Sequence, residues 1–467
     1  MEINLDNYTK IPLEQLKFYK EVISKDKIEI IAKNTNGIIN IIPSSKINYL
    51  FENDNNILFK DSEYYIYKSY LEMFDFFLGL DELDNKDYFY SIFTNCKDPS
   101  QKISKVQEQM LEEILSMAKY QRIENIKNLI KELQAEENKD KFTIKACNII
   151  GEILIKLGLI QRINVIGNIN DDDKINDSKN INVNYEELIK STAESAFVLL
   201  NKHYEKYDML KDTVGFTGHN IIDHSNRLFI NIIEFMIFYN KNINMGLLSK
   251  IRAKWMNKYI QYYTKISKKN KFIKDPSRLD NIFKLGIRSF DYIEIVNMAA
   301  AALLHDITLT EIINYLPTEN NYINNNEIYS HSIKSYNYLK YSISNNQDIN
   351  LAVGTHHEYY GYGYGLSMTL LDSIRSKRPN FEYKYLISFD SKDILNFEAS
   401  VFYPVKILEI LDIYDSLKYK HDICLDSINT NEEIIDYMYN NFLKDEVKID
   451  YIIFSIFKNY LSDIKSF

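Results

Sequence analysis

The sequence predicts a mainly α-helical protein, with an all-helical bundle in the C-terminal half, preceded by further helices and a small α+β module at the N-terminus. Glycine and proline are scarce, with 13 and 7 among 467 residues, which favours helices over a turn-rich all-β fold. Beyond residue 185 no stretch of useful length alternates with period two, so nearly everything there is expected to be helical. Short strand-like segments occur only near the N-terminus.

Residues 1–82 are expected to form the small α+β module, an input domain. The pair Asn36-Gly37 is a hairpin signal between two apolar runs. The expected strands are Lys27–Lys33, Ile38–Ile42, Ile57–Lys60 and Tyr64–Lys68, and a helix near Leu71–Leu80 ends the module.

Residues 83–184 are expected to be a helical connector. Helical spacing is seen in Val106, Met110, Ile114 and Met117, in Ile126, Leu129 and Leu133, and over Ala146–Ile160. The segment 168–184 is rich in asparagine and contains Asp171-Asp172-Asp173, so it is expected to be a polar loop. Residues 185–467 then form the predicted helical domain.

Charge and composition limit the class of protein. The formal net charge is −9, which argues against binding a DNA or RNA polymer. The cysteines Cys96, Cys147 and Cys424 show neither a zinc spacing nor a disulfide framework, which favours a reducing cytoplasm. No signal peptide is visible at the N-terminus. Apolar runs such as Met298–Leu304 are too short to span a membrane.

The helical half carries an ordered series of histidines and carboxylates. The series consists of His224, His305-Asp306, His331, His356-His357-Glu358 and Asp412. Taken singly, His224 or His331 could be a helix-capping residue, and Asp412 a hydrogen-bonded core carboxylate. Imidazole and carboxylate together suit iron, manganese, zinc or nickel. A carboxylate that bridges two such ions would allow them to activate water and to neutralise a phosphodiester. The series therefore predicts a two-metal site.

These residues resemble the HD-GYP family, a branch of the HD metal-dependent phosphohydrolases, over roughly residues 205–465. The resemblance implies an HD-domain bundle that hydrolyses cyclic di-GMP through a metal-bridged hydroxide. It implies two divalent transition-metal ions, iron or manganese. One ion would be held by His224, His305, Asp306 and Asp412, and the other by Asp306, His331, His356 and His357.

The resemblance also implies roles beyond the metal ligands. Asp306 and Glu358 would be the catalytic carboxylates, with Glu358 orienting ligands rather than binding metal. The substrate contacts would come from Arg227, Gly361, Tyr362, Gly363 and Tyr364. The N-terminal module is similar to the input domains fused ahead of such domains, and a homodimer is an open expectation for the assembly.

The chain departs from the family at several positions. Leu309 replaces a lysine that would face the substrate phosphate. The glycine-tyrosine motif is one residue shorter, and Gly365 stands in place of a proline. Asn220 replaces a glutamate that gives some members a third metal, and His219 competes with His224 as the first histidine.

An unusually long segment separates His224 from His305. It contains Trp255 and the basic residues Lys265, Lys268, Lys269, Lys271, Lys274 and Arg278. The segment could cover the active site, contact a partner or be a solvated helical insertion.

Three functions follow from these observations. The first is an active cyclic di-GMP phosphodiesterase. The second is a weak or inactive domain that senses cyclic di-GMP or binds a protein. The third is an HD hydrolase of another phosphorylated nucleotide.

Overall fold

The computed structural model describes residues 8–11, 30–34, 38–43, 62–67, 123–136, 144–168, 179–202, 220–270, 275–309, 331–378, 381–419 and 430–464. The chain divides into two compact units. The first comprises Met1–Arg122 and Ile312–Asn321, and the second comprises Ile123–Glu311 and Tyr322–Phe467. Each is described by itself.

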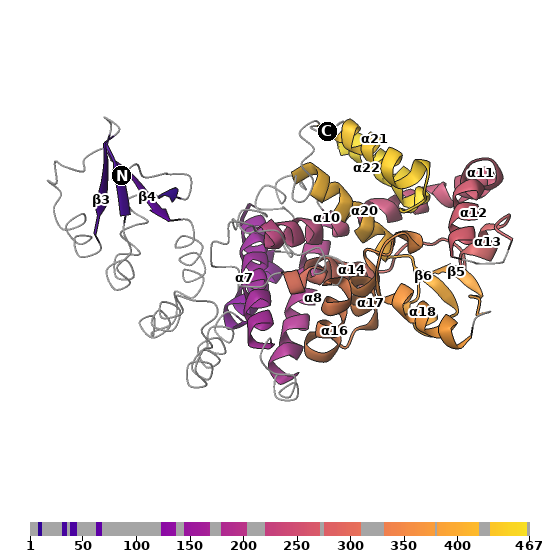
Figure 1. Cartoon of the computed structure of the whole chain (residues 1–467), viewed down its shortest axis with the longest axis horizontal. Helices are drawn as coiled ribbons and strands as arrows, with labels where there is room; N and C mark the ends of the chain where they lie inside the picture. Colours follow the sequence, from indigo (N-terminus) through magenta and orange to yellow (C-terminus); the bar gives the residue numbers. More distant parts are fainter. Residues whose placement is uncertain are drawn as a thin grey trace. The chain divides into compact units, whose positions relative to one another are not determined.

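The first unit contains a four-stranded antiparallel sheet (Figure 1). Its strands are β1 (Tyr8–Ile11), β2 (Ile30–Lys33), β3 (Ile39–Ile42) and β4 (Glu63–Tyr67), in the order β1-β4-β2-β3. Strands β2 and β3 pair as neighbours, with Ile30 opposite Ile42, which confirms the predicted hairpin. The predicted strand Ile57–Lys60 and helix Leu71–Leu80 lie outside the described residues.

The second unit is mainly helical, as predicted, and residues 123–136 form its first described helix (Figure 1). The longer helices are α7 (Ile144–Asn168), α8 (Lys179–Lys202), α10 (Asn220–Asn242), α12 (Ile260–Lys269), α14 (Tyr292–Leu304), α16 (His331–Tyr338), α17 (Gln347–Thr355), α18 (Leu366–Lys377), α20 (Val405–Tyr419), α21 (Asn431–Tyr439) and α22 (Tyr451–Ile464). Shorter helices are α11 (Leu248–Lys254), α13 (Leu279–Ile282) and α19 (Ser391–Leu395).

Helix α14 is the centre of this unit. It packs against α8, α10, α17 and α20, and every residue from Ile295 to Leu304 is buried. The run Ala299–Ala302 keeps the helix narrow, so neighbouring helices can approach closely. Within the described part of the chain, Tyr292–Leu309 is long and apolar enough to cross a membrane, and 67% of it is buried here. A core helix of a globular protein has the same composition.

Two short strands within the second unit contradict the expectation that residues beyond 185 lack strands. Strands β5 (Tyr385–Ser388) and β6 (Ala399–Phe402) pair in parallel. Both are almost completely buried. A strand that is buried on both faces does not alternate between apolar and polar residues. For this reason β5 and β6 have no period-two pattern in the sequence.

The predicted connector, residues 83–184, is divided between the two units, and its described residues from Ile123 onward belong to the second unit. Helix α7 extends to Asn168, and α8 begins at Lys179, so the last residues of the predicted polar loop 168–184 are helical. Tyr185 on α8 is fully buried and donates a hydrogen bond to the carbonyl oxygen of Leu157 on α7, at 2.8 Å. Both helices also pack against α10. The predicted boundary at residue 184 therefore falls within a continuous helix.

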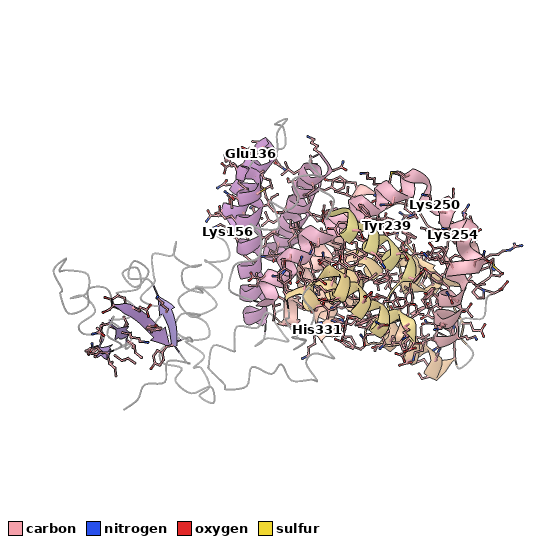
Figure 2. All side chains as sticks on the ribbon, turned by 90° about the horizontal axis from the view of Figure 1, so that it is seen from above. Glu136, Lys156, Tyr239, Lys250, Lys254 and His331 are labelled. Atoms are coloured by element: carbon pink, nitrogen blue, oxygen red, sulfur yellow. The ribbon has the colours of Figure 1, made fainter. Side chains whose placement is uncertain are left out.

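The long segment between His224 and His305 is mainly helical where it is described, although residues 275–278 and 283–291 are not helical. Helices α11 and α12 follow α10, and buried Trp255 donates to the carbonyl oxygen of Pro276 at 3.0 Å. Lys250 and Lys254 lie on the exposed surface of α11 (Figure 2). The segment therefore has a packed side and a solvated side.

Candidate metal centre

The C-terminal end of α14 positions the first two residues of the centre. Asp291 and Glu294 form a capping box at the start of this helix, which fixes where the helix begins. At its end, Gln161 of α7 donates to the carbonyl oxygen of Leu303 at 3.0 Å. His305 and Asp306 follow directly, and His305 is fully buried. The helix thus delivers both side chains into the interior.

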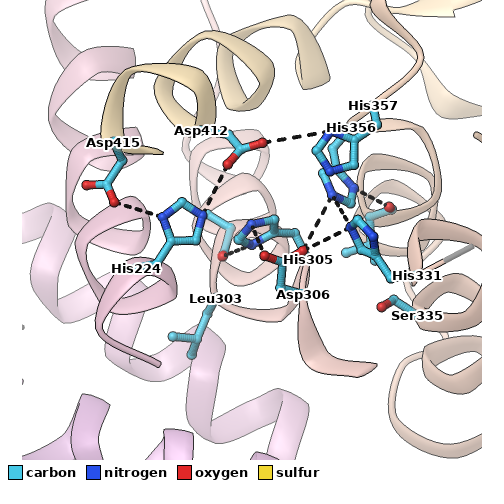
Figure 3. Close-up of polar contacts among 12 residues, drawn as sticks. His224, Leu303, His305, Asp306, His331, Ser335, His356, His357, Asp412 and Asp415 are labelled. Atoms are coloured by element: carbon cyan, nitrogen blue, oxygen red, sulfur yellow. Dashed lines mark hydrogen bonds and ion pairs between the residues drawn. The ribbon is translucent and has the colours of Figure 1, made fainter. Parts of the chain in front are cut away.

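A first group of potential ligands consists of His224 from α10, His305 after α14 and Asp412 from α20. One ligand atom from each lies within 4.8 Å of the others. Nε2 of His224 is 3.1 Å from Oδ1 of Asp412, and the two imidazole centroids are 5.2 Å apart. We call these three residues the first cluster (Figure 3).

A second group consists of Asp306, His331, His356 and His357, which also offer ligand atoms within 4.8 Å of one another. Nε2 of His331 is 3.2 Å from Nε2 of His356. His331 opens α16, whereas His356 and His357 directly follow α17. We call these four residues the second cluster (Figure 3).

Asp306 joins the two clusters. Its Oδ2 lies 3.2 Å from Nε2 of His305, whereas its Oδ1 lies 3.1 Å from Nε2 of His331 and 3.7 Å from Nε2 of His356. Asp412 also faces both clusters, because its Oδ2 lies 3.9 Å from Nδ1 of His357. This arrangement brings together all seven residues that the sequence predicts as metal ligands.

Hydrogen bonds on the outer side of three imidazoles orient them. Nδ1–H of His305 donates to the carbonyl oxygen of Ala302 at 2.8 Å, and Nδ1–H of His356 donates to that of Val353 at 2.7 Å. Nδ1–H of His224 donates to a carboxylate, Oδ2 of Asp415, at 2.8 Å. A proton on Nδ1 leaves Nε2 of a neutral ring as the lone-pair donor, which is the arrangement of metal-binding histidines.

Two buried atoms in the centre test whether a cation fits. Nε2 of His305 and Oδ1 of Asp306 are buried without a hydrogen-bond partner of suitable geometry, although other ligand atoms lie near them. Unsatisfied buried polar groups are costly. A cation at each cluster would satisfy one of these atoms, so both clusters have donors that could bind a divalent metal ion.

The ionisation of the centre also fits cation binding. Burial raises the pKa of the Asp306 carboxyl, but the close imidazoles, His305 first and then His331 and His356, bring it well below its usual range. Burial lowers the pKa values of His356 and His357. Burial opposes the charged form of His224 as well, but Asp412 and Asp415 raise its pKa to about 10, so a cation at Nε2 of His224 would have to replace a proton there. Ionised carboxylates and neutral imidazoles are the forms that bind metal.

Asp415 contacts His224 from outside the first cluster, and the sequence did not predict a role for it. It is fully buried and lies one helical turn after Asp412 on α20. Nε of Arg227 donates to its Oδ1 at 2.9 Å, and Nη2 donates to its Oδ2 at 2.7 Å. The spacing Asp412-x-x-Asp415 was the available signal, because it places both carboxylates on one helix face.

Arg227, which was predicted to contact substrate, contacts Asp415 and Tyr419 in the structure. Besides its bidentate bond to Asp415, its guanidinium lies 4.0 Å from the ring centroid of Tyr419. Its observed role is to hold Asp415 behind His224. A substrate contact by this side chain stays a prediction.

Glu358 anchors the loop that follows it, and its predicted role in orienting metal ligands stays a prediction. Its Oε1 accepts hydrogen bonds from the backbone N–H groups of Ser367 at 2.5 Å and Met368 at 3.2 Å. These groups belong to the first turn of α18, where backbone N–H groups lack helical partners. Burial raises the pKa of Glu358 to about 7.

The four loop residues predicted to contact substrate lie in different surroundings. Gly361 has φ +86°, and a Cβ on Gly363 would lie 1.8 Å from the carbonyl oxygen of His357. The ring of Tyr364 lies 5.1 Å from that of His357, whereas Lys269 covers Tyr362 at 4.4 Å. Tyr364 is thus beside the centre, and Tyr362 contacts the long segment.

The residues after Asp306 form a short 3-10 turn, Ile307–Leu309. Oγ1 of Thr308 is 2.9 Å from Oγ of Ser335, which ties the turn to α16. The backbone N–H of Leu309 donates to the carbonyl oxygen of Asp306 at 2.8 Å. His219, the competing first histidine, lies outside the described residues.

Comparison with family models, with curated proteins and with solved structures finds no match to this chain. The fold and the site therefore rest on the geometry described above.

Proposed function

We propose that this protein is a metal-dependent phosphodiesterase that hydrolyses cyclic di-GMP. The observation that carries the proposal is that Asp306 joins two clusters of buried histidines and carboxylates. Carboxylate-bridged ion pairs are typical of enzymes that cleave phosphate esters. The choice of cyclic di-GMP depends on the resemblance of these motifs to the HD-GYP family.

Each cluster has a distinct role in this proposal. The first cluster would hold one ion and the second cluster the other, with Asp306 contributing to both. When bound, such ions activate water and neutralise the charge that develops on a phosphodiester. The residues themselves would hold the ions at fixed positions, because Asp415 and the carbonyl oxygens of Ala302 and Val353 orient the imidazoles.

The charge of the chain supports a small anionic substrate. A net charge of −9 disfavours long polyanions, which require many cationic contacts. Two divalent ions would instead provide local positive charge for a single phosphodiester. A cytoplasmic location and a homodimeric assembly remain predictions.

Leu309 favours a second candidate, a domain that binds cyclic di-GMP with weak or no turnover. In the HD-GYP family, which the motifs resemble, this position carries a lysine that would face the phosphate, whereas the side chain of leucine cannot donate a hydrogen bond. Loss of one electrostatic donor typically slows an enzyme by a factor of about 100 to 1,000. Intact metal ligands beside an altered substrate contact therefore also suit a slow enzyme or a receptor.

The test is metal content combined with product analysis. Protein purified without oxygen is measured for iron and manganese and then incubated with cyclic di-GMP, followed by chromatography of the products. Two ions per chain with formation of the linear dinucleotide or GMP would support the phosphodiesterase. Two ions with tight ligand binding and no product would favour the receptor.

A double variant identifies the site responsible. His305→Ala combined with Asp306→Ala should remove both metal and hydrolysis. Hydrolysis that survives this change would place the active site elsewhere in the chain.

A further inference from the structure

The hydroxyl group of Tyr359 lies beside the metal centre. Its Oη is 2.9 Å from Nδ1 of His357, and the same nitrogen is 3.9 Å from Oδ2 of Asp412. The tyrosine ring packs edge-on to Phe442, with centroids 6.2 Å apart. The phenol oxygen is thus next to a ligand of the second cluster, at the nitrogen that faces the first cluster.

The backbone around Tyr359 adopts an unfavourable conformation. Tyr359 and Tyr360 have φ values of +44° and +56°, and Gly361 follows with +86°. Only glycine enters this left-handed region without a steric penalty. Such strain is found at functional sites, where surrounding contacts maintain it. Here the carbonyl oxygen of Glu358 accepts from the N–H groups of Gly361 at 2.7 Å and Gly363 at 3.1 Å.

Other contacts hold Tyr359 at both ends. Its backbone N–H donates to Oε1 of Glu409 at 3.3 Å, and Nζ of Lys406 donates to the same oxygen at 2.6 Å. Lys406 and Glu409 are both buried. The strained turn therefore directs the phenol toward His357 from a rigid base.

The number of protons in this contact determines its direction. A neutral imidazole carries one N–H, and a phenol carries one O–H. In His305 and His356, the outer hydrogen bond is donated by Nδ1, which leaves Nε2 free to bind an ion. If His357 also binds an ion through Nε2, then Nδ1 of His357 carries the hydrogen and donates it to Oη of Tyr359. The phenol hydrogen is then directed to a different acceptor.

We propose that Tyr359 is a positioning residue of the metal centre, which accepts a hydrogen bond from Nδ1–H of His357 and presents its own hydroxyl hydrogen to a phosphoryl oxygen of the substrate. The second part rests on the proposed function, and the first requires only that the centre binds metal. In this role Tyr359 supplies a neutral hydrogen-bond donor, which the side chain of Leu309 cannot be.

The test compares Tyr359→Phe with the wild-type full-length chain, both loaded with Mn²⁺. Competition with a chelator gives the affinity for each ion, and inorganic phosphate serves as an anionic probe of the loaded protein. Loss of an outer hydrogen bond should weaken the binding of one ion by a factor of about 10 to 100. Phosphate binding at saturating Mn²⁺ should weaken by a factor of about 10 or more.

Tyr360→Phe is the matched control for loop rigidity. Tyr360 is in the same strained turn, but its hydroxyl donates to Oδ2 of Asp450 at 2.7 Å, away from His357. This variant should unfold at a lower temperature and keep the wild-type affinity for both ions. If it weakens ion binding as much as Tyr359→Phe does, the phenol of Tyr359 has no separate role and the proposal is wrong.

Two further outcomes separate this proposal from the proposed function. If Tyr359→Phe binds Mn²⁺ and phosphate with wild-type affinity, the proposed role of Tyr359 is wrong, whether or not the protein hydrolyses cyclic di-GMP. If the wild-type chain binds two ions but does not hydrolyse cyclic di-GMP, the phosphodiesterase assignment fails. The Mn²⁺ and phosphate measurements would still decide the role of Tyr359.

Discussion

Oδ2 of Asp415 lies 2.8 Å from Nδ1 of His224, while Nε2 of the same ring lies 3.1 Å from Asp412. The imidazole is thus held between two carboxylates on the same face of α20. Asp412 belongs to the first cluster, whereas Asp415 is behind the ring and is itself held by Arg227. A metal ligand supported in this way loses its orientation when the outer carboxylate is removed.

Asp415→Asn should therefore weaken the ion of the first cluster. Asparagine removes the negative charge that Arg227 and His224 share, so a decrease in affinity of about 10- to 100-fold is expected. The measurement is a titration with Mn²⁺ in the presence of a competing chelator. Asp348→Asn is the control, since Asp348 accepts a hydrogen bond from Asn297 outside the centre. Equal affinities in the two variants would contradict the role of Asp415.

Single ligand variants should differ in how many ions they lose. Asp306→Ala removes a carboxylate that faces both clusters, so this variant should bind neither ion tightly. His331→Ala affects only the second cluster and should keep one ion per chain. Elemental analysis of the purified variants gives the ratio directly. One retained ion in Asp306→Ala would show that this carboxylate does not bridge.

Gly363→Ala should disturb the centre through the backbone. The added Cβ would lie 1.8 Å from the carbonyl oxygen of His357, so the loop must move and carry His357 with it. The variant should lose the second ion and hydrolytic activity. Gly246→Ala is the control, because Gly246 also has a positive φ, +89°, but nothing lies within 4 Å of its added Cβ. It should be less stable and bind both ions normally.

Leu309→Lys should reveal whether a phosphate contact limits the rate. A lysine at this position could donate to the substrate, and one such donor is worth a factor of about 100 to 1,000 in rate. A higher turnover number with unchanged metal content is expected, measured by product chromatography. An unchanged rate would indicate that the position does not face the substrate in this chain.

The grouping of these seven histidines and carboxylates could be predicted from the sequence, because their types and order follow a metal-site pattern, and the structure brings their side chains together. His305-Asp306 directly follows the apolar run Met298–Leu304, a local pattern typical of a buried helix, and the structure has α14 ending there. The structure also confirms two other predictions, the helical character of the second unit and the hairpin of β2 and β3. These features depend on local patterns.

The remaining contacts depend on tertiary packing and could not be predicted. The bond between Arg227 and Asp415 joins residues that are 188 positions apart, and only the crossing of α10 and α20 brings them together. Tyr359 faces the centre because its backbone enters the left-handed region, which no propensity predicts for tyrosine. Strands β5 and β6 gave no alternating pattern because both their faces are buried.

Glu409→Gln should change how stability depends on pH. Burial raises the pKa of Glu409 to about 7, although Lys406 acts against this shift. In the unfolded chain the pKa of a glutamate is about 4.3. Between these values the folded chain keeps a proton that the unfolded chain has released, so this group lowers the free energy of unfolding as the pH rises from about 4.5 to about 7. Glutamine does not titrate, so the decrease should be smaller in the variant.

Urea unfolding at about pH 5 and about pH 8 measures the change in the free energy of unfolding. Asp436→Asn, at an exposed position, is the control. Identical pH dependence in the variant and the wild type would show that Glu409 is ionised throughout.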